Sequence, residues 1–141
     1  MGLVSLQLSD ETELMVYLLR LDKGGYHPVS GGTLVGPSGE VHPLSMENLK
    51  IEVLDTWTSR RTGATYPCRW RLRVIPFGLD VHLFSDLADQ ELITQRSTRV
   101  IYWEGSISAK GDRNGTSLQG KGYAEMTGYA TAFDLLKESL P

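Results

Sequence analysis

The sequence has little of what marks several large classes of protein. Its 141 residues contain one cysteine, Cys68, so no internal disulfide can form and a thiolate metal cluster is excluded. Its three histidines, His27, His42 and His82, lack the spacing of a histidine metal site, so we expect no metal and no cofactor. No stretch approaches the roughly eighteen apolar residues of a membrane span, and no signal-peptide pattern begins the chain. We therefore expect a soluble protein, in a compartment that the sequence leaves open.

The chain also lacks a large excess of charge of either sign. With 14 lysines and arginines against 17 aspartates and glutamates, the net charge is −3. A surface that follows a nucleic-acid backbone needs a strong excess of basic residues, so nucleic acid is not an expected partner. The content of 40% hydrophobic and 22% charged residues is typical of a soluble globular protein that buries one core without the help of disulfide bonds or structural metal ions. We expect residues 1–141 to form a single domain.

What the chain does have is alternation of apolar and polar residues with period two, interrupted by turn residues at nearly regular intervals. The alternation predicts strands near 3–8, 12–21, 31–35, 40–45, 48–58, 65–75, 79–85, 90–94, 98–109 and 117–128. A short helix is predicted from Thr131 through Ser139, because Phe133, Leu136 and Leu140 recur at helical spacing.

The residue pattern of the segment 65–75 predicts which face of this strand is buried. Five apolar or weakly polar residues alternate there with three arginines: Tyr66, Cys68, Trp70, Leu72 and Val74 against Arg69, Arg71 and Arg73. A slip of one residue in strand register would bury three guanidinium groups, so the register should be firmly set. The arginines are either an anion-binding patch or a solvated outer face. We favour the outer face, because Glu52 on the preceding strand is a candidate cross-strand partner.

These elements predict an all-β fold. Ten antiparallel strands with one terminal helix are typical of a lipocalin-like up-and-down β-barrel of about 8–10 strands with a short C-terminal helix. Closure of such a barrel removes exposed sheet edges. A flattened β-sandwich is the alternative.

The most informative pair of segments is Tyr102–Gly105 and Gly120–Tyr129. Asn114-Gly115 between them predicts a type I′ hairpin turn, which would pair the two segments as neighbouring strands. Alternation then places Tyr102 and Glu104 on one face of the first strand, and Tyr123 and Glu125 together on one face of the second. Trp103 lies on the opposite face of its strand, where the glycines leave room for it.

Glu104 and Glu125 are the catalytic candidates. If both faced a narrow apolar lumen, repulsion and desolvation would raise one carboxyl pKa and keep a proton available near neutral pH. The alternative is a pair of outward-facing carboxylates, or carboxylates that hold a strand by bonding a tyrosine hydroxyl. A further acidic group, Asp89-Gln90-Glu91, is either a cation site with oxygen ligands or an acidic turn, and the turn is the favoured interpretation.

Four ordered motifs together resemble a known family. They are Trp57-x-Ser59-x-x-x-Gly63-x-x-Tyr66-Pro67-x-x-Trp70, Asp89-Gln90-Glu91, Tyr102-Trp103-Glu104-Gly105, and Gly120-x-Gly122-Tyr123-x-Glu125-x-Thr127-Gly128-Tyr129. Over about residues 5 to 130 the chain resembles the C-terminal part of the AttH and carotenoid 1,2-hydratase (hydroxyneurosporene synthase) family. The resemblance implies a lipocalin-like barrel. Full-length members look like two such barrels in tandem, which implies that this chain is one half of a two-barrel architecture.

The resemblance also implies apolar polyene or polyketide substrates, including water addition to an isoprenoid double bond. Three functional hypotheses follow. The first is binding of a hydrophobic isoprenoid- or lipid-like ligand, with Trp57, Trp70, Tyr102, Trp103 and Tyr123 as ligand-binding candidates. The second is a hydratase that adds carboxylate chemistry from Glu104 and Glu125. The third is a structural barrel that packs on a second lipocalin-like domain or forms a homo-oligomer.

Overall fold

The computed structural model describes residues 2–94, 97 and 100–130. Within them lie ten strands: β1 (Gly2–Leu8), β2 (Glu13–Leu18), β3 (Gly31–Val35), β4 (Val41–Ser45), β5 (Leu49–Thr58), β6 (Thr65–Val74), β7 (Leu79–Ser85), β8 (Glu91–Ile93), β9 (Ile101–Arg113) and β10 (Thr116–Thr127). Two short 3-10 turns, η1 (Met46–Asn48) and η2 (Ile75–Phe77), follow β4 and β6. Each predicted strand is present, although the second is shorter and the ninth extends to the hairpin turn. The helix predicted from Thr131 lies outside the described residues.

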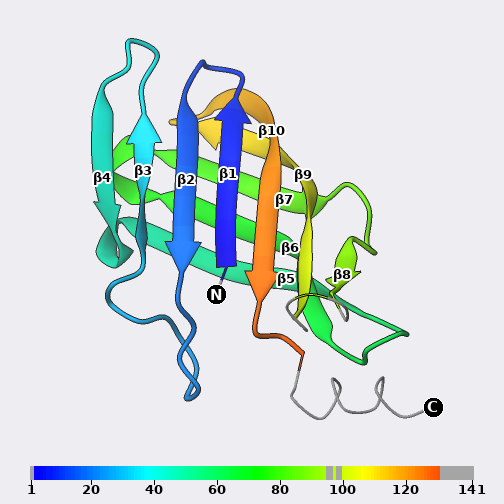
Figure 1. Cartoon of the computed structure of the whole chain (residues 1–141). Coiled ribbons are helices and arrows are strands. Elements are labelled where there is room, and N and C mark those ends of the chain that lie inside the picture. Colours follow the sequence, from blue (N-terminus) through cyan, green and yellow to red (C-terminus); the bar gives the residue numbers. More distant parts are fainter. Residues whose placement is uncertain (1, 95–96, 98–99, 131–141) are drawn as a thin grey trace, which may run out of the picture.

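The strands form one curled antiparallel sheet in the order β4-β3-β2-β1-β10-β9-β7-β6-β5, with β8 paired to β9. In Figure 1, β1 to β4 and β10 form the front of the molecule, while β5, β6 and β7 cross behind them. The first and last strands pair, as in a lipocalin-like barrel. The predicted fold is confirmed with one difference: among the described residues β4 and β5 do not pair, so the structure is a half-barrel that retains two sheet edges.

The β9–β10 hairpin connects the front and back of the curled sheet. Asn114 and Gly115 have φ values of 49° and 85°, as the predicted type I′ turn requires. Further along β10, any side chain at Gly122 would collide with the carbonyl group of Ser5 on β1. The glycine therefore lets β1 and β10 approach closely where the sheet curls.

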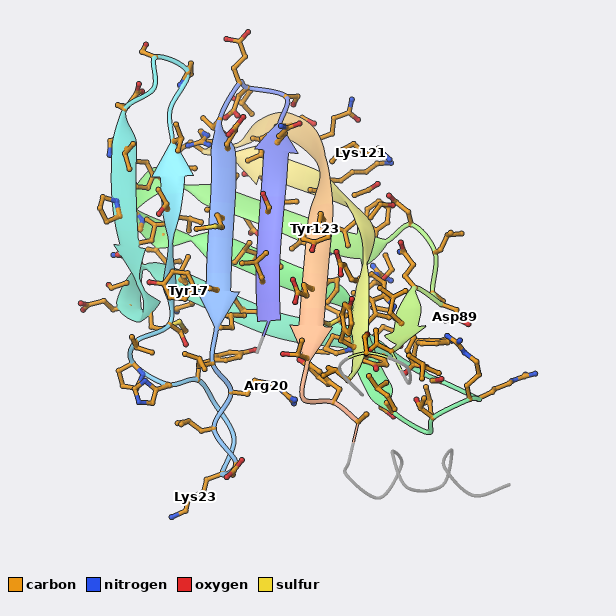
Figure 2. All side chains as sticks on the ribbon, viewed as in Figure 1. Tyr17, Arg20, Lys23, Asp89, Lys121 and Tyr123 are labelled. Atoms are coloured by element: carbon orange, nitrogen blue, oxygen red, sulfur yellow. The ribbon has the colours of Figure 1, made fainter. Side chains whose placement is uncertain are left out.

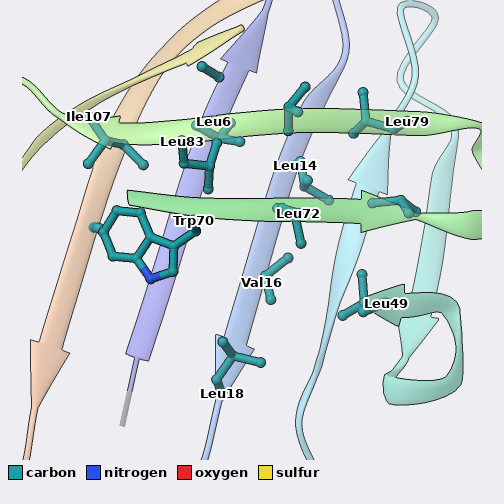
Figure 3. Close-up of a cluster of buried hydrophobic side chains, with 14 of the residues drawn as sticks. Leu6, Leu14, Val16, Leu18, Leu49, Trp70, Leu72, Leu79, Leu83 and Ile107 are labelled. Carbon is teal, nitrogen blue, oxygen red and sulfur yellow. The ribbon is translucent and has the colours of Figure 1, made fainter. Parts of the chain in front are cut away.

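The interior of the half-barrel is filled by side chains from both layers. Leu6, Leu14 and Trp70 belong to one continuous buried cluster, part of which is drawn in Figure 3. The predicted face of β6 is confirmed at Tyr66, Trp70, Leu72 and Val74, which are buried, whereas Cys68 is half-buried.

The arginines of β6 lie on the opposite, outer face. Arg71 lies opposite Glu52 in register, as expected, but its ion pair at 2.7 Å is with Asp80 on β7. The hydrogen bond from Arg71 holds the pKa of the Asp80 carboxyl below its usual value. The arginine row is therefore a partly exposed outer face with an ion pair of its own.

Candidate functional site

One end of the half-barrel carries a group of aromatic side chains with an arginine. We call this group the aromatic rim: it consists of the rings of Tyr26, Trp57, Tyr66 and Tyr129 and the guanidinium of Arg20. The Trp57 and Tyr66 rings stack with centroids 6.2 Å apart, and the Tyr66 and Tyr129 centroids are 5.5 Å apart. The Arg20 guanidinium carbon lies 3.5 Å from the centre of the Tyr129 ring, a cation–π contact. Figure 2 places Arg20 just beyond the end of β2.

Local turns bring these residues together. Tyr26 pairs with Arg20 across the glycine turn Gly24-Gly25, and Gly128 has a φ of 79° immediately before Tyr129. The Arg20 Nη2 donates a hydrogen bond of 2.8 Å to the Gly128 carbonyl oxygen, which fixes the guanidinium over the Tyr129 ring. Burial raises the pKa of the Tyr129 hydroxyl, so this ring stays neutral near physiological pH.

A small cavity opens at the aromatic rim. Its volume is about 30 Å³, and its lining includes Arg20, Tyr26, Trp70, Glu125 and Tyr129. That volume holds a water molecule but not a ligand. The cavity combines apolar walls with the side chains of one arginine and two tyrosines, a composition that suits a small-molecule site.

Beside the rim lies a buried carboxylate. The Glu91 side chain is 0% exposed, and it accepts hydrogen bonds from Ser59 Oγ at 2.6 Å, Thr62 Oγ1 at 2.7 Å and the Tyr66 hydroxyl at 2.8 Å. The guanidinium of Arg61 lies 3.7 Å from Glu91 Oε1. Burial, and then the hydrogen bond to Glu91, raise the pKa of Tyr66 well above its usual value. Three hydroxyl donors and a nearby cation compensate the desolvation of this charge.

The sequence suggested a cation site or an acidic turn at Asp89-Gln90-Glu91. Asp89 lies at the surface, where it pairs with Arg61 at 3.1 Å, and Gln90 donates to two backbone carbonyls. In the described part of the chain no three histidine, cysteine or acidic side chains come together as metal ligands. Glu91 is instead an internal acceptor. Its donors Ser59 and Tyr66 belong to the first sequence motif, but their convergence on Glu91 was not predicted.

The candidate pair Glu104 and Glu125 lies on the outer face of the sheet. The two residues are directly opposite each other on β9 and β10, and both are half-buried. The Tyr123 hydroxyl lies 2.7 Å from Glu104 Oε1 and 3.3 Å from Glu125 Oε2. The hydrogen bond to Glu104 is the main cause that raises the pKa of Tyr123. Glu125 also lines the rim cavity, so the pair adjoins the aromatic rim from outside.

The five predicted ligand-binding residues are divided between three places. Trp57 belongs to the aromatic rim, and Trp70 lines its cavity from the core. Trp103 is 1% exposed inside the core, where its Nε1 donates to the Ala88 carbonyl at 2.8 Å. Tyr102 and Tyr123 are half-buried on the outer face. Their roles stay predictions, whereas Arg20, Tyr26 and Tyr129 join the candidate site from positions that had not been singled out as ligand-binding.

A larger, open groove of about 630 Å³ lies on the outer face between β1, β7, β9 and β10. Its polar side chains already bond one another: Asp86 accepts from Ser106 and Ser108, and Lys121 Nζ donates to Ser108 Oγ at 2.8 Å. The two serine hydroxyls hold the pKa of Asp86 below its usual value. These contacts join β7 to the β9–β10 hairpin.

Comparison with known proteins agrees with this architecture. The AttH-like family profile matches residues 3–129. The chain belongs to the AttH-like family. Two similar solved structures are an AttH protein from Nitrosomonas europaea, with 28% identity and a TM-score of 0.80, and kievitone hydratase from Nectria haematococca, with 25% identity and a TM-score of 0.72. Each alignment covers 92% of this chain.

The AttH-like chain is short beside these relatives. It spans 38% of the Nitrosomonas protein and 39% of kievitone hydratase. A comparison with curated protein sequences gives no match. Within the described residues, no helix has the length and apolarity needed to cross a membrane.

Proposed function

We propose that this AttH-like domain contributes its aromatic rim to a binding site for a hydrophobic isoprenoid- or lipid-like ligand, as one barrel of a longer two-barrel protein. The observation that carries the proposal is the contrast between a filled interior and a rim where Tyr129, Tyr26 and Arg20 surround a small cavity. A cavity of about 30 Å³ cannot enclose a ligand, so the domain would supply one wall of the site. The greater length of both solved relatives is consistent with a second wall from further chain.

The rim suits an extended unsaturated ligand for a physical reason. The partly exposed rings of Trp57 and Tyr129, which both pack against the buried Tyr66 ring, offer apolar area at a small loss of side-chain entropy. Arg20, which lines the cavity, would orient a polar end group. Together these groups would hold the ligand with its apolar body on the rings.

Quenching of tryptophan fluorescence by all-trans-retinol, an isoprenoid polyene, tests the proposal. We expect saturable quenching, and we expect Tyr129→Ala to weaken retinol affinity about tenfold because it removes a ring of the rim that lines the cavity. Phe84→Ala is the matched control, since Phe84 is a half-buried aromatic residue in the outer groove. Quenching that does not saturate, or equal losses in the two variants, would contradict a rim site.

A second candidate function is hydration of a carbon–carbon double bond. It is favoured by the Glu104–Tyr123–Glu125 cluster beside the rim cavity and by the similarity to kievitone hydratase. In such a reaction a carboxylic acid gives its proton to one alkene carbon, leaving a cation on the other. Water attacks the cation, and the proton that it loses returns to the carboxylate. Glu125 is the candidate acid, because its carboxylate contacts the Tyr123 hydroxyl and the residue borders the rim cavity.

Mass spectrometry of retinol incubated with the chain tests this second function. Addition of one water molecule is expected with the wild type, a reduced yield with Glu125→Asp, and none with Glu125→Gln. Retinol binding should survive in all three proteins. A Glu125→Gln variant that still forms the hydrated product would remove Glu125 from the role of acid.

A further inference from the structure

Strand β5 is an uncovered edge of the sheet. Among the described residues it pairs with β6 alone, and no strand lies between it and β4. Val53 faces the interior, directly opposite the buried Trp70, and is nevertheless 45% exposed. Exposure of an apolar residue on the inner face is consistent with an incomplete wall at this edge. The backbone groups on this edge are available to another strand.

Open space follows this edge. A cavity of about 390 Å³ is lined by Tyr26, Met46, the β5 residues 49–52 and, from β6, Arg71 and Arg73. Tyr26 also lines the rim cavity, together with Val53. A bulge between Val53 and Asp55 interrupts the regular strand beyond this point. The edge segment available to a partner strand is therefore Leu49–Val53.

The sequence of this segment is complementary to itself. It reads apolar, basic, apolar, acidic, apolar, as Leu49-Lys50-Ile51-Glu52-Val53. In an antiparallel pairing centred on Ile51, Lys50 lies opposite Glu52 of the second copy, and Leu49 lies opposite Val53 of the second copy. Lys50 and Glu52 are exposed on the outer face, so two ion pairs would form there while the apolar residues meet on the inner face.

We propose that the β5 edges of two copies of this chain pair antiparallel over Leu49–Val53, joining two half-barrels into one continuous sheet. The dimer covers Val53 and places the second copy's strand beside the rim cavity. Its interface is small, so the association is expected to be weak and concentration-dependent. The inference does not depend on the ligand proposed for the aromatic rim.

Sedimentation of the 141-residue chain over a concentration series reaching about 1 mM tests the dimer. Lys50→Glu should weaken association at least about tenfold, because the new carboxylate of each copy then lies against Glu52 of the other. Glu52→Lys should do the same with two lysines. An equimolar mixture of the two variants, one carrying a fluorescent label, should restore association, because each acidic segment then meets a basic one.

Lys110→Glu is the matched control, with the same change of charge at an exposed position on β9, and it should associate as the wild type does. Circular dichroism confirms that each variant is folded. A wild type that stays monomeric throughout the series overturns the proposal, as does a mixture that fails to associate. Slow exchange in a monomer of those Leu49–Val53 amides that point away from β6 would also overturn it, since the edge would then be covered by the chain itself.

Discussion

Two clusters in this molecule join glutamate to tyrosine, and they differ in almost every physical respect. Glu91 is buried and accepts hydrogen bonds from three hydroxyl groups that converge from the β5–β6 loop and from β6. Glu104 and Glu125 face outward on adjacent strands and share the single hydroxyl of Tyr123. The first cluster has more donors than charges, and the second has more charges than donors.

The difference indicates that the Glu91 cluster stabilises the fold, whereas the Glu104–Glu125 cluster is available for chemistry. A buried carboxylate with all its donors in place is fixed and inaccessible, so Glu91 holds the β5–β6 loop and β8 in position beside the aromatic rim. Two half-exposed carboxylates that compete for one hydroxyl have bonding capacity left for a ligand or a proton. The chemistry proposed for this domain therefore belongs to the outer cluster, and the inner cluster supports the rim.

Replacement of Glu91 should have the largest effect. Glu91→Ala leaves three buried hydroxyl groups without their acceptor, and the free energy of unfolding should fall by about 3–5 kcal/mol. Glu91→Gln keeps one acceptor oxygen and should cost about 1–3 kcal/mol. Urea denaturation followed by tryptophan fluorescence measures both.

The control for Glu91 is Glu104→Gln, which changes the same side chain on the outer face and should stay within about 0.5 kcal/mol of the wild type. If the Glu91 and Glu104 variants lose similar stability, the distinction between a structural and an accessible cluster is wrong.

Replacement of the tyrosine in each cluster, Tyr66 or Tyr123, should change the free energy of unfolding by an intermediate amount. Tyr66→Phe removes a buried donor to Glu91 and should cost about 1–3 kcal/mol, whereas Tyr123→Phe on the outer face should cost about 1 kcal/mol or less. Both hydroxyls have a raised pKa in the folded protein. The unfolded chain therefore loses these protons first, near pH 10, and the stability that they contribute is lost as the pH rises further.

Tyrosinate absorbance during an alkaline titration measures this effect directly. In the wild type, Tyr66 and Tyr123 should be among the tyrosines that ionise only as the protein unfolds, and each phenylalanine variant should show one fewer of these. A Tyr123 that ionises like a free tyrosine in the folded protein would mean that Glu104 does not hold its proton.

The fold could be predicted because its signals are local. Alternation of Trp70 and Leu72 with the arginines located β6 and its face, and Asn114-Gly115 located the hairpin that pairs Glu104 with Glu125. The Glu91 cluster could not be predicted in this way, because its donors lie between 25 and 32 residues away in the chain. Convergence of that kind depends on how the loop after β5 packs, which no period in the sequence records.

The gap between β4 and β5 could not be predicted from the sequence for the same reason. A strand pattern predicts that β4 and β5 exist, but whether they pair depends on the path that the chain takes through η1 and on the curl of the whole sheet. Alternation placed Glu104 and Glu125 on the face opposite Trp103 but left open whether that face is the lumen or the outside, and the burial of Trp103 decides for the outside.

The smallest effect is expected at Glu125. Its carboxylate lies directly opposite that of Glu104, and its contact with the Tyr123 hydroxyl is the longer one, at 3.3 Å. Glu125→Gln therefore removes a like-charge repulsion at the expense of a weak hydrogen bond, and it should stabilise the fold by about 0.5 kcal/mol. Urea denaturation at low salt should show the gain, and added salt should reduce it, because the repulsion is screened. A loss of more than about 1 kcal/mol would place Glu125 with Glu91 as a structural group and weaken its candidacy as a catalytic acid.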